Sequence, residues 1–567
     1  MAAVQDSVPL GKTDGSTIPS GGPSIELVEK EGTTSLLAAE RKSLEVSVPT
    51  GTPESGEKQA VGTAPAAARP AAEQVPIPCG MNRYVLAGFF CVVVLLKGCT
   101  YWGWNGMQEM MYKSGVYEWE CGPDSAGAGV LRVGNVDYPD CAARKNMINN
   151  LYTATFSAHF ISSAASGVLL DAAGPKICML AALAIEAAGW LLIGFSSQSF
   201  QGYYAGGVFL GVAADPGYLP LLSVANLFRG NESFLMAVLG SLRSISFAVP
   251  VILSAIFQSE SFAPDDFWKI IVMYVAIGLG LSTIVTLFLV PMSPFKPRSE
   301  LEDAAVAGEA SSREDAPQRC ASYTGGEEAA QRPAVAERAE GPRSFVAALK
   351  SKEFLLIVPC FVIALLRAEF YTKSNKEQLQ VSSSSNVYQM FSVLNIMSFL
   401  PGPVFGKMTD KFGILPVIAT LNTFGIFLYV FVMPNVLACK AISTLLYFVY
   451  CSFVLSNLYC YVAINFPSEY FGKLTGLASL IGGVFSLTSI GWYKLSSETL
   501  LDMAPYNFLP ADGIMVFFGL VNCVIILAMF RQDKAKKVLT KENPYLDVSG
   551  KNVQGAEGDA EAAEAAV

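Results

Sequence analysis

Ionisable side chains inside long apolar runs are the residues of this chain best placed to do chemistry. Seven stand out, namely Lys97, His159, Glu186, Asp215, Arg243, Arg367 and Glu369. A charge at the centre of a membrane helix costs roughly 2.5 to 3.5 kcal/mol on insertion scales, so each needs an internal partner or an aqueous cavity. The cations could hold a carboxylate, and the acids could hold an ammonium or grip a planar guanidinium with two oxygens. The alternative is that these residues pair with one another as fixed structural bridges.

The elements that must position these side chains are membrane-spanning helices. The chain has 567 residues, of which 52% are apolar and 15% charged, and soluble proteins of this length rarely show such a balance. Runs long enough to cross about 30 Å of hydrocarbon recur along it. They lie at 84–111, 147–170, 177–196, 202–227, 234–257, 268–290, 353–372, 387–405, 414–433, 439–465, 474–494 and 513–530. The sequence therefore predicts an all-α membrane protein with 12 transmembrane helices in a lipid bilayer. No basic patch with interleaved aromatics suggests a nucleic-acid partner.

The runs divide into two sets of six with polar segments around them. We expect a disordered cytoplasmic tail at 1–80, a six-helix bundle at 83–291, a disordered linker at 292–346, a second six-helix bundle at 347–530 and a cytoplasmic tail at 531–567. The first tail and the linker are rich in small, polar and charged residues, which bury too little surface to offset the entropy of ordering. No cleavable signal peptide is evident at the start of the chain.

Lysine and arginine near the ends of the runs predict the orientation, since positive residues are retained on the cytoplasmic side. The count favours both termini in the cytoplasm, with Lys176 and Lys407 on that side. Cys121 and Cys141 then lie together in the long first exofacial loop, where a disulfide persists, and we expect them to pair. The alternatives are two independent thiols, or a competing pairing with Cys439 near the outer end of the tenth run.

A loop motif repeats at equivalent places in the two halves. After the second and eighth runs the chain reads G-x-x-x-D-x-x-G, with Gly167, Asp171 and Gly174 followed by Lys176 in the first copy, and Gly406, Asp410 and Gly413 in the second. Glycine lets two helix ends approach closely and turn, while the aspartate can meet a helix N-terminus or a cation. Two copies, each on the side predicted to be cytoplasmic, resemble the loop motif of the major facilitator superfamily. That fold is two six-helix halves around a central site.

Other segments narrow the resemblance. The sequences Tyr101-Trp102-Gly103-Trp104, Asn226-Leu227-Phe228, Glu118-Trp119-Glu120-Cys121 and Phe471-Gly472-Lys473-Leu474-Thr475-Gly476-Leu477 resemble the system L type transporters of large neutral amino acids. Pro291-Met292-Ser293-Pro294-Phe295 matches the sugar porters only in part. Residues 83–530 are most similar to the apicomplexan amino acid transporter family, relatives of the system L branch, whereas the tails and the linker carry no resemblance.

The resemblance implies which buried charges meet a substrate. In this fold spans 1, 4, 7 and 10 line the central cavity, which selects Lys97, Asp215, Arg367 and Glu369, and Arg243 in span 5 could still reach it. Lys97 or Arg243 could hold the carboxylate of an amino acid. Asp215 or Glu369 could hold its ammonium, or the guanidinium of a cationic substrate.

Three further features accompany these charges. Tyr101 and its neighbouring tryptophans could bracket a side-chain pocket, or could be interface anchors. Asp215-Pro216-Gly217 interrupts backbone hydrogen bonding halfway through span 4 and marks a hinge, a binding site or a kink. His159 is the only histidine, and we interpret it as a packed interhelical hydrogen bonder rather than a proton relay.

These observations predict a permease and not an enzyme. The sequence shows no phosphate-binding loop, catalytic triad or metal cluster, so we expect no catalytic residues, no metal and no cofactor, and transport that is facilitative or coupled to an ion gradient. The leading hypothesis is a multi-pass plasma-membrane transporter of cationic amino acids, arginine favoured, working by alternating access. The alternatives are a transporter of large neutral or aromatic amino acids, and a non-transporting nutrient sensor on a transporter scaffold. A monomer is the working expectation.

Overall fold

The computed structural model describes residues 74–296, 344–466 and 468–542, apart from gaps at 123–124, 126, 134–135, 229–230 and 382–386. The predicted tail up to residue 73, the linker from 297 to 343 and the tail from 543 onward lie outside the described residues. Everything below concerns the described residues of the unit Ala68–Val567.

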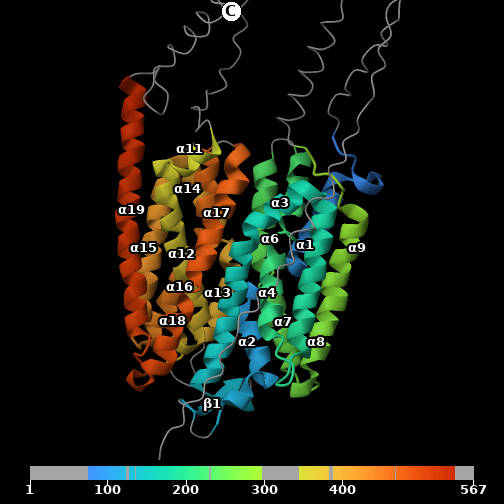
Figure 1. The fold of residues 1–567 in the computed structure, drawn as a ribbon, viewed down its shortest axis with the longest axis vertical. Helices are drawn as coiled ribbons and strands as arrows, with labels where there is room; N and C mark the ends of the chain where they lie inside the picture. The colour runs from blue at the N-terminus through green and yellow to red at the C-terminus, as the bar shows by residue number, and fades with distance from the viewer. Residues whose placement is uncertain are drawn as a thin grey trace, which may run out of the picture. The chain divides into compact units, whose positions relative to one another are not determined.

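The N-terminal half consists of helices broken by short irregular segments (Figure 1). After the turn η1 (Pro78–Gly80) come α1 (Arg83–Lys97), η2 (Thr100–Trp102), α2 (Trp104–Lys113), η3 (Glu118–Glu120), β1 (Gly129–Val133), β2 (Val136–Asp140), α3 (Ala142–Phe195), α4 (Tyr203–Ala214), α5 (Leu219–Leu222), η4 (Ser223–Leu227), α6 (Glu232–Ile245), α7 (Ala248–Phe257), η5 (Pro264–Asp266), α8 (Phe267–Tyr274), the π-helical turn η6 (Val275–Leu279) and α9 (Gly280–Leu289).

The C-terminal half is likewise helical, and its elements follow in the same way. They are α11 (Phe345–Leu349), α12 (Lys352–Leu379), α13 (Val387–Ile396), η7 (Met397–Phe399), α14 (Gly402–Phe412), α15 (Ile414–Val432), α16 (Leu437–Asn465), α17 (Ser468–Ser486), α18 (Ser489–Lys494), the π-helical turn η8 (Leu495–Thr499), η9 (Leu501–Met503) and α19 (Leu509–Glu542). Figure 1 shows α19 running past the ends of its neighbours, beyond the predicted end of its apolar run at 530.

Within the described part of the chain, nine helices are long and apolar enough to cross a membrane. The number differs from twelve for two reasons. The predicted runs at 147–170 and 177–196 form one helix, α3, which turns at Gly174. The runs at 84–111 and 387–405 are each divided into shorter helices. The count of twelve and the cytoplasmic placement of both termini stay predictions.

The breaks follow from residues that cannot continue a packed helix. Asp215-Pro216-Gly217 separates α4 from α5, as the missing proline N–H requires. Between α1 and α2, a Cβ on Gly103 would lie 2.2 Å from the Phe247 carbonyl oxygen, so only glycine lets this turn pack against the start of α7. Both interruptions lie in segments that the sequence analysis assigned to the cavity.

The two halves pack along α3 and α17, and η7 packs on α6. Small residues permit this approach, because a Cβ on Gly476 would lie 2.8 Å from the Ala164 Cα. At one end of the helices β1 and β2 form an antiparallel hairpin in which Gly129 pairs with Asp140 (Figure 1). We call that end the disulfide side, because the disulfide between Cys121 and Cys141 flanks the hairpin. It is the side that the orientation predicts to be exofacial.

Candidate functional site

Asp215 is the centre of a buried network in the N-terminal half. Its Oδ1 accepts hydrogen bonds from Arg243 Nη2 at 2.8 Å and from His159 Nε2 at 2.9 Å. On the other face of the imidazole, Tyr101 Oη lies 2.7 Å from Nδ1. The guanidinium of Arg243 also sits over the ring of Tyr218, 4.5 Å from its centroid. The break between α4 and α5 therefore presents an acid whose charge Arg243 balances and whose carboxylate also accepts from His159.

The sequence predicts His159 to be a packed interhelical hydrogen bonder, and in the structure it links Tyr101 to Asp215. The link joins η2, α3 and the α4–α5 break. The sequence indicated this link only weakly, because a linear pattern does not show which helices pack against each other.

Lys97 does not join this network. Its Nζ lies 3.0 Å from Glu186 Oε2, and both side chains are buried, although the angle is not that of a hydrogen bond. The ammonium also reaches the α4–α5 break, since a Cβ on Gly217 would lie 1.6 Å from it. Lys97, predicted as a carboxylate ligand, is thus held by an acid of α3, and Gly217 is needed to make room for it.

Arg367 lies inside the C-terminal half. Its Nη1 donates to Asn422 Oδ1 at 3.0 Å, and its guanidinium sits between the rings of Tyr429 and Tyr450, with centroids at 5.6 and 5.8 Å. A Cβ on Gly519 would come within 3.1 Å of the guanidinium. Helices α12, α15, α16 and α19 of one half therefore surround Arg367, which places it away from the boundary between the halves.

Glu369 is at that boundary. Thr153 Oγ1 of α3 donates to Glu369 Oε1 at 2.6 Å, and Lys373 Nζ donates to the same hydroxyl at 2.9 Å and to Asn150 Oδ1 at 3.1 Å. The other carboxylate oxygen, Glu369 Oε2, has no hydrogen-bond partner among the described residues. Thr153, Glu369 and Lys373, which we call the boundary cluster, bring an acid and a base of α12 against one hydroxyl of the opposite half.

Lys373 was missed as a candidate because the apolar run was expected to end at 372, with Lys373 and Lys376 outside it. Instead α12 continues to Leu379, and both lysines are buried. The available signal was their spacing, since residues four apart lie on one face of a helix and Glu369 and Lys373 have that spacing.

Aromatic side chains surround the network and the cluster from both halves. In the N-terminal half Tyr152 packs against Trp104, with ring centroids 5.2 Å apart, and against Tyr101 at 6.1 Å. In the C-terminal half Tyr371 stacks on Tyr447 at 4.6 Å. Tyr101, predicted to bracket a side-chain pocket, is therefore part of an aromatic wall and of the Asp215 network at once.

Further polar contacts close the boundary toward the disulfide side. Asn105 Nδ2 donates to Ser392 Oγ at 2.9 Å, Asn149 Nδ2 donates to Tyr493 Oη at 2.5 Å, and Ser497 Oγ donates to Asn146 Oδ1 at 2.7 Å. Each bond joins one half to the other. Asn146 and Asn149 also donate to the carboxylates of Glu498 and Glu377, so side-chain amides take part in most of the described bonds between the halves at this end.

The loop-motif residues lie at the opposite end of the helices. The last glycine of each copy, Gly174 and Gly413, has a positive φ, of 77° and 85°. A Cβ on Gly174 would also lie 2.2 Å from the Met292 carbonyl oxygen, whereas at the first glycines, Gly167 and Gly406, a Cβ would meet nothing within 4 Å. The turn therefore depends on the last glycine of the motif.

Of the charged residues of the motif, one is exposed to solvent and another donates a hydrogen bond to a neighbouring helix. Asp171 is exposed, and Lys176 Nζ donates to the Leu287 carbonyl oxygen at 3.1 Å, which ties α3 to α9. The side chain of Asp410 lies outside the described part of the structure.

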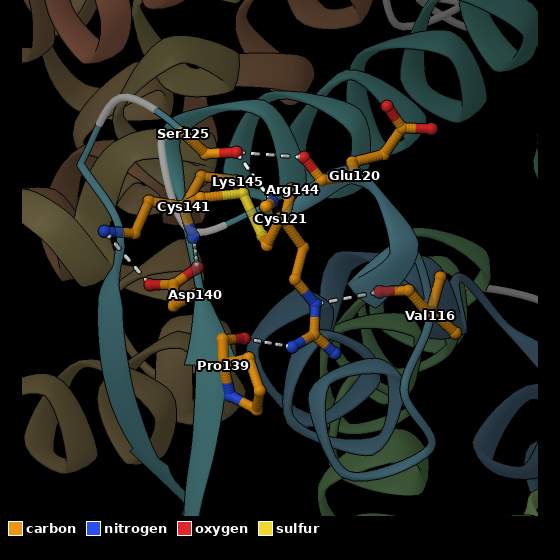
Figure 2. Close-up of a disulfide and its surroundings, with 10 residues drawn as sticks. Val116, Glu120, Cys121, Ser125, Pro139, Asp140, Cys141, Arg144 and Lys145 are labelled. Carbon is orange, nitrogen blue, oxygen red and sulfur yellow. Dashed lines mark hydrogen bonds and ion pairs between the residues drawn. A yellow bond between two sulfur atoms is a disulfide. The ribbon is translucent and has the colours of Figure 1, made fainter.

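The disulfide side is organised by a covalent bond between Cys121 and Cys141 (Figure 2). Cys439 is a free thiol. Next to the disulfide Arg144, fully buried, donates to the carbonyl oxygens of Val116 and Pro139. These contacts fix β2 and the segment that follows α2 to the start of α3.

Comparison with known proteins identifies the family. Residues 139–489 match the Major Facilitator Superfamily. The aromatic and large neutral amino acid transporter 5-3 of Toxoplasma gondii is 31% identical, over 92% of this chain and 97% of its own. Arginine transporter 1 of the same organism is 29% identical, over 84% and 94%. Cationic amino acid transporter 8 of Plasmodium berghei is 26% identical, over 72% and 82%.

Solved structures show the same fold at low sequence identity. A POT family transporter superposes with a TM-score of 0.53 and 11% identity over 81% of this chain and 99% of its own. A D-xylose-proton symporter gives 0.51 and 13% over 78% and 97%. The chain therefore belongs to the Major Facilitator Superfamily of membrane transporters and, within it, to the apicomplexan amino acid transporter family.

Proposed function

We propose that this chain carries amino acids across a membrane by alternating access, with residues 83–291 and 347–530 moving against each other around the boundary cluster. The observation that carries the proposal is the contact of Glu369 and Lys373 with Thr153. An amino acid has an ammonium and a carboxylate on one carbon. An acid and a base one helical turn apart can hold these two groups as charge-assisted hydrogen bonds.

The same contact couples binding to movement. Because Thr153 belongs to the half opposite Glu369 and Lys373, a substrate that takes over either α12 side chain replaces a bond between the halves. Substrate binding then changes the free-energy difference between the closed and open boundary, which is the requirement for alternating access.

The geometry favours a large neutral or aromatic side chain. The sequence pointed to arginine because acids occur in cavity-lining spans. Asp215, however, already accepts hydrogen bonds from Arg243 and His159, so it is not free to bind the guanidinium of a substrate. Tyr101, Trp104 and Tyr152 supply a flat apolar surface instead. The Toxoplasma gondii relative with 31% identity is named for aromatic and large neutral amino acids.

A cationic substrate is the second candidate, and one observation supports it. Glu369 Oε2 has no hydrogen-bond partner among the described residues, so this carboxylate can accept from a cation. Two relatives carry arginine or cationic amino acids in their names.

Uptake into oocytes that express the full chain tests both candidates. Radiolabelled tyrosine, leucine and arginine are supplied with and without sodium and at several external pH values. Saturable tyrosine uptake supports the first candidate, and saturable arginine uptake supports the second. If the substrate is cationic, Glu369→Gln should abolish arginine uptake selectively. If it is neutral or aromatic, the same variant should reduce the uptake of every substrate, because every amino acid has an ammonium group.

The control for this experiment is Glu353→Gln, which removes an acid from the same helix, α12, at its far end, where Glu353 pairs with Lys536. Surface labelling of the oocytes reports plasma-membrane localisation, which we also propose. Silence across the panel by a surface-expressed chain would overturn the proposed amino acid transport and favour another solute or the nutrient sensor.

A further inference from the structure

A cavity of about 280 Å³ opens on the disulfide side, between the two halves. Its polar lining includes Tyr112, Lys145, Lys376, Glu377, Gln378 and Lys440, from α2, α3, α12 and α16. The volume is close to the lower end of the roughly 300 to 1,000 Å³ typical of small-molecule sites. No residue of the boundary cluster lines it, so this cavity is a separate place on the molecule.

Four buried polar atoms of the lining have no hydrogen-bond partner among the described residues. They are Tyr112 Oη, Lys376 Nζ, Glu377 Oε2 and Gln378 Oε1. Leaving such an atom unpaired costs about 1 to 3 kcal/mol, and more when it is charged. Side chains arranged in this way around a cavity are typical of a site that a ligand completes.

Among the four atoms, Lys376 Nζ gives the strongest indication of the kind of ligand. Its side chain is 8% exposed, and its Nζ lies 4.5 Å from the ring centroid of Tyr112 and 5.6 Å from that of Tyr388. The other lining lysines are engaged, since Lys145 pairs with Asp140 at 3.0 Å and Lys440 donates to the Val432 carbonyl oxygen at 2.5 Å. Lys376 is therefore the lining cation best placed to bind an anionic group.

The atoms match the two ends of an α-amino acid. Lys376 Nζ and Tyr112 Oη can donate to a carboxylate, while Glu377 Oε2 and Gln378 Oε1 can accept from an ammonium. Tyr112 of α2 and the three α12 residues line the same cavity, so one small zwitterion can meet both donors and acceptors. An inorganic anion would satisfy the donors alone and would leave both acceptors unpaired.

We propose that this cavity is a second binding site for an amino acid zwitterion, which holds the substrate on the disulfide side before it reaches the boundary cluster. The inference rests on the proposed amino acid transport and adds to it a place on the route. Lys376 is three residues beyond Lys373 on α12, about one turn further toward the disulfide side.

The first test is the concentration dependence of uptake by the full chain in oocytes, with radiolabelled L-tyrosine and L-arginine as probes. Lys376→Gln removes one charge-assisted contact, so the KM should rise about tenfold with little change in the maximal rate. Lys376→Arg keeps the charge and should restore most of the affinity. The control is Lys494→Gln, the same charge change at a residue 64% exposed on the same side.

The second test measures binding without transport. Purified Glu369→Gln protein, impaired at the boundary cluster, should still bind labelled L-tyrosine, and the double variant Glu369→Gln/Lys376→Gln should lose that remaining binding. Equal binding by the two, or an unchanged KM in a surface-expressed Lys376→Gln variant, would overturn the second site while leaving the proposed function intact. If the wild type transports no amino acid but binds one in a Lys376-dependent manner, the proposed function fails and the site stands.

Discussion

Thr153 of α3 donates a 2.6 Å hydrogen bond to Glu369 of α12, and the two residues are 216 positions apart in the chain. Lys373 donates to the same hydroxyl. One threonine therefore meets the acid and the base of the opposite half, and the boundary between the halves closes on the groups that we propose to bind substrate.

Replacement of Thr153 tests the coupling between binding and closure. Thr153→Ala removes the hydroxyl and leaves Glu369 and Lys373 each with one partner fewer, at a cost of about 1 to 3 kcal/mol to the closed boundary. Because transport needs the boundary to close and open in turn, initial uptake per surface-expressed molecule should fall about tenfold or more. The matched control is Thr155→Ala, since the Thr155 hydroxyl bonds to Leu151 of its own helix. Equal rates for both variants would show that the bond has no part in transport.

The ion pair of Asp215 and Arg243 should be a large term in stability. Asp215→Asn leaves the partly buried guanidinium of Arg243 without its counter-charge, a loss of up to about 3 kcal/mol in free energy of unfolding. The thermal unfolding midpoint of the purified protein in detergent measures it. The double variant Asp215→Asn/Arg243→Gln should recover part of the loss, because the uncompensated charge is gone.

Asp533→Asn is the control for that measurement, since its pair with Lys537 is exposed to solvent and the midpoint should not move. A single Asp215→Asn variant as stable as the wild type would argue that the pair contributes nothing.

The bond between Cys121 and Cys141 should stabilise the disulfide side. It closes a loop with a sequence separation of 20, for which the chain-entropy estimate is about 3 kcal/mol. Cys141→Ser, or reduction of the wild type, should therefore lower the unfolding midpoint and the amount of protein at the cell surface. Cys439→Ser is the comparison, because Cys439 is a free thiol. If both substitutions lowered the midpoint equally, the loss could not be assigned to the disulfide.

Close packing of α3 against α17 should depend on Gly483. A Cβ there would lie 2.9 Å from the Ile161 backbone nitrogen, so Gly483→Ala must push the two helices apart, at a cost of about 1 to 3 kcal/mol. Uptake and the unfolding midpoint should both fall. At Gly491 a Cβ would meet nothing within 4 Å, so Gly491→Ala should change neither. A Gly483→Ala variant with normal uptake would mean that the contact tolerates separation.

The family was predictable from sequence because its evidence is local. Apolar length indicates a membrane helix wherever it occurs, and two copies of a glycine and aspartate motif can be compared without knowing the fold. The resemblance to apicomplexan amino acid transporters was confirmed by the comparisons. The helix breaks at Gly103 and Asp215-Pro216-Gly217 also follow from residue type, because proline lacks a donor and glycine permits close packing.

By itself, therefore, the sequence determined that this is a helical membrane protein of the superfamily, and that seven ionisable residues lie within its long apolar runs. Only the tertiary structure decided how they are paired: Lys97 with Glu186, Asp215 with Arg243 and His159, and Glu369 with Thr153. It also decided that Lys373 and Lys376 are buried, because α12 continues past its apolar run between the two halves. The physical reason is that the partner of a buried charge lies on another helix, and the packing of helices, rather than their order in the chain, sets which side chains meet.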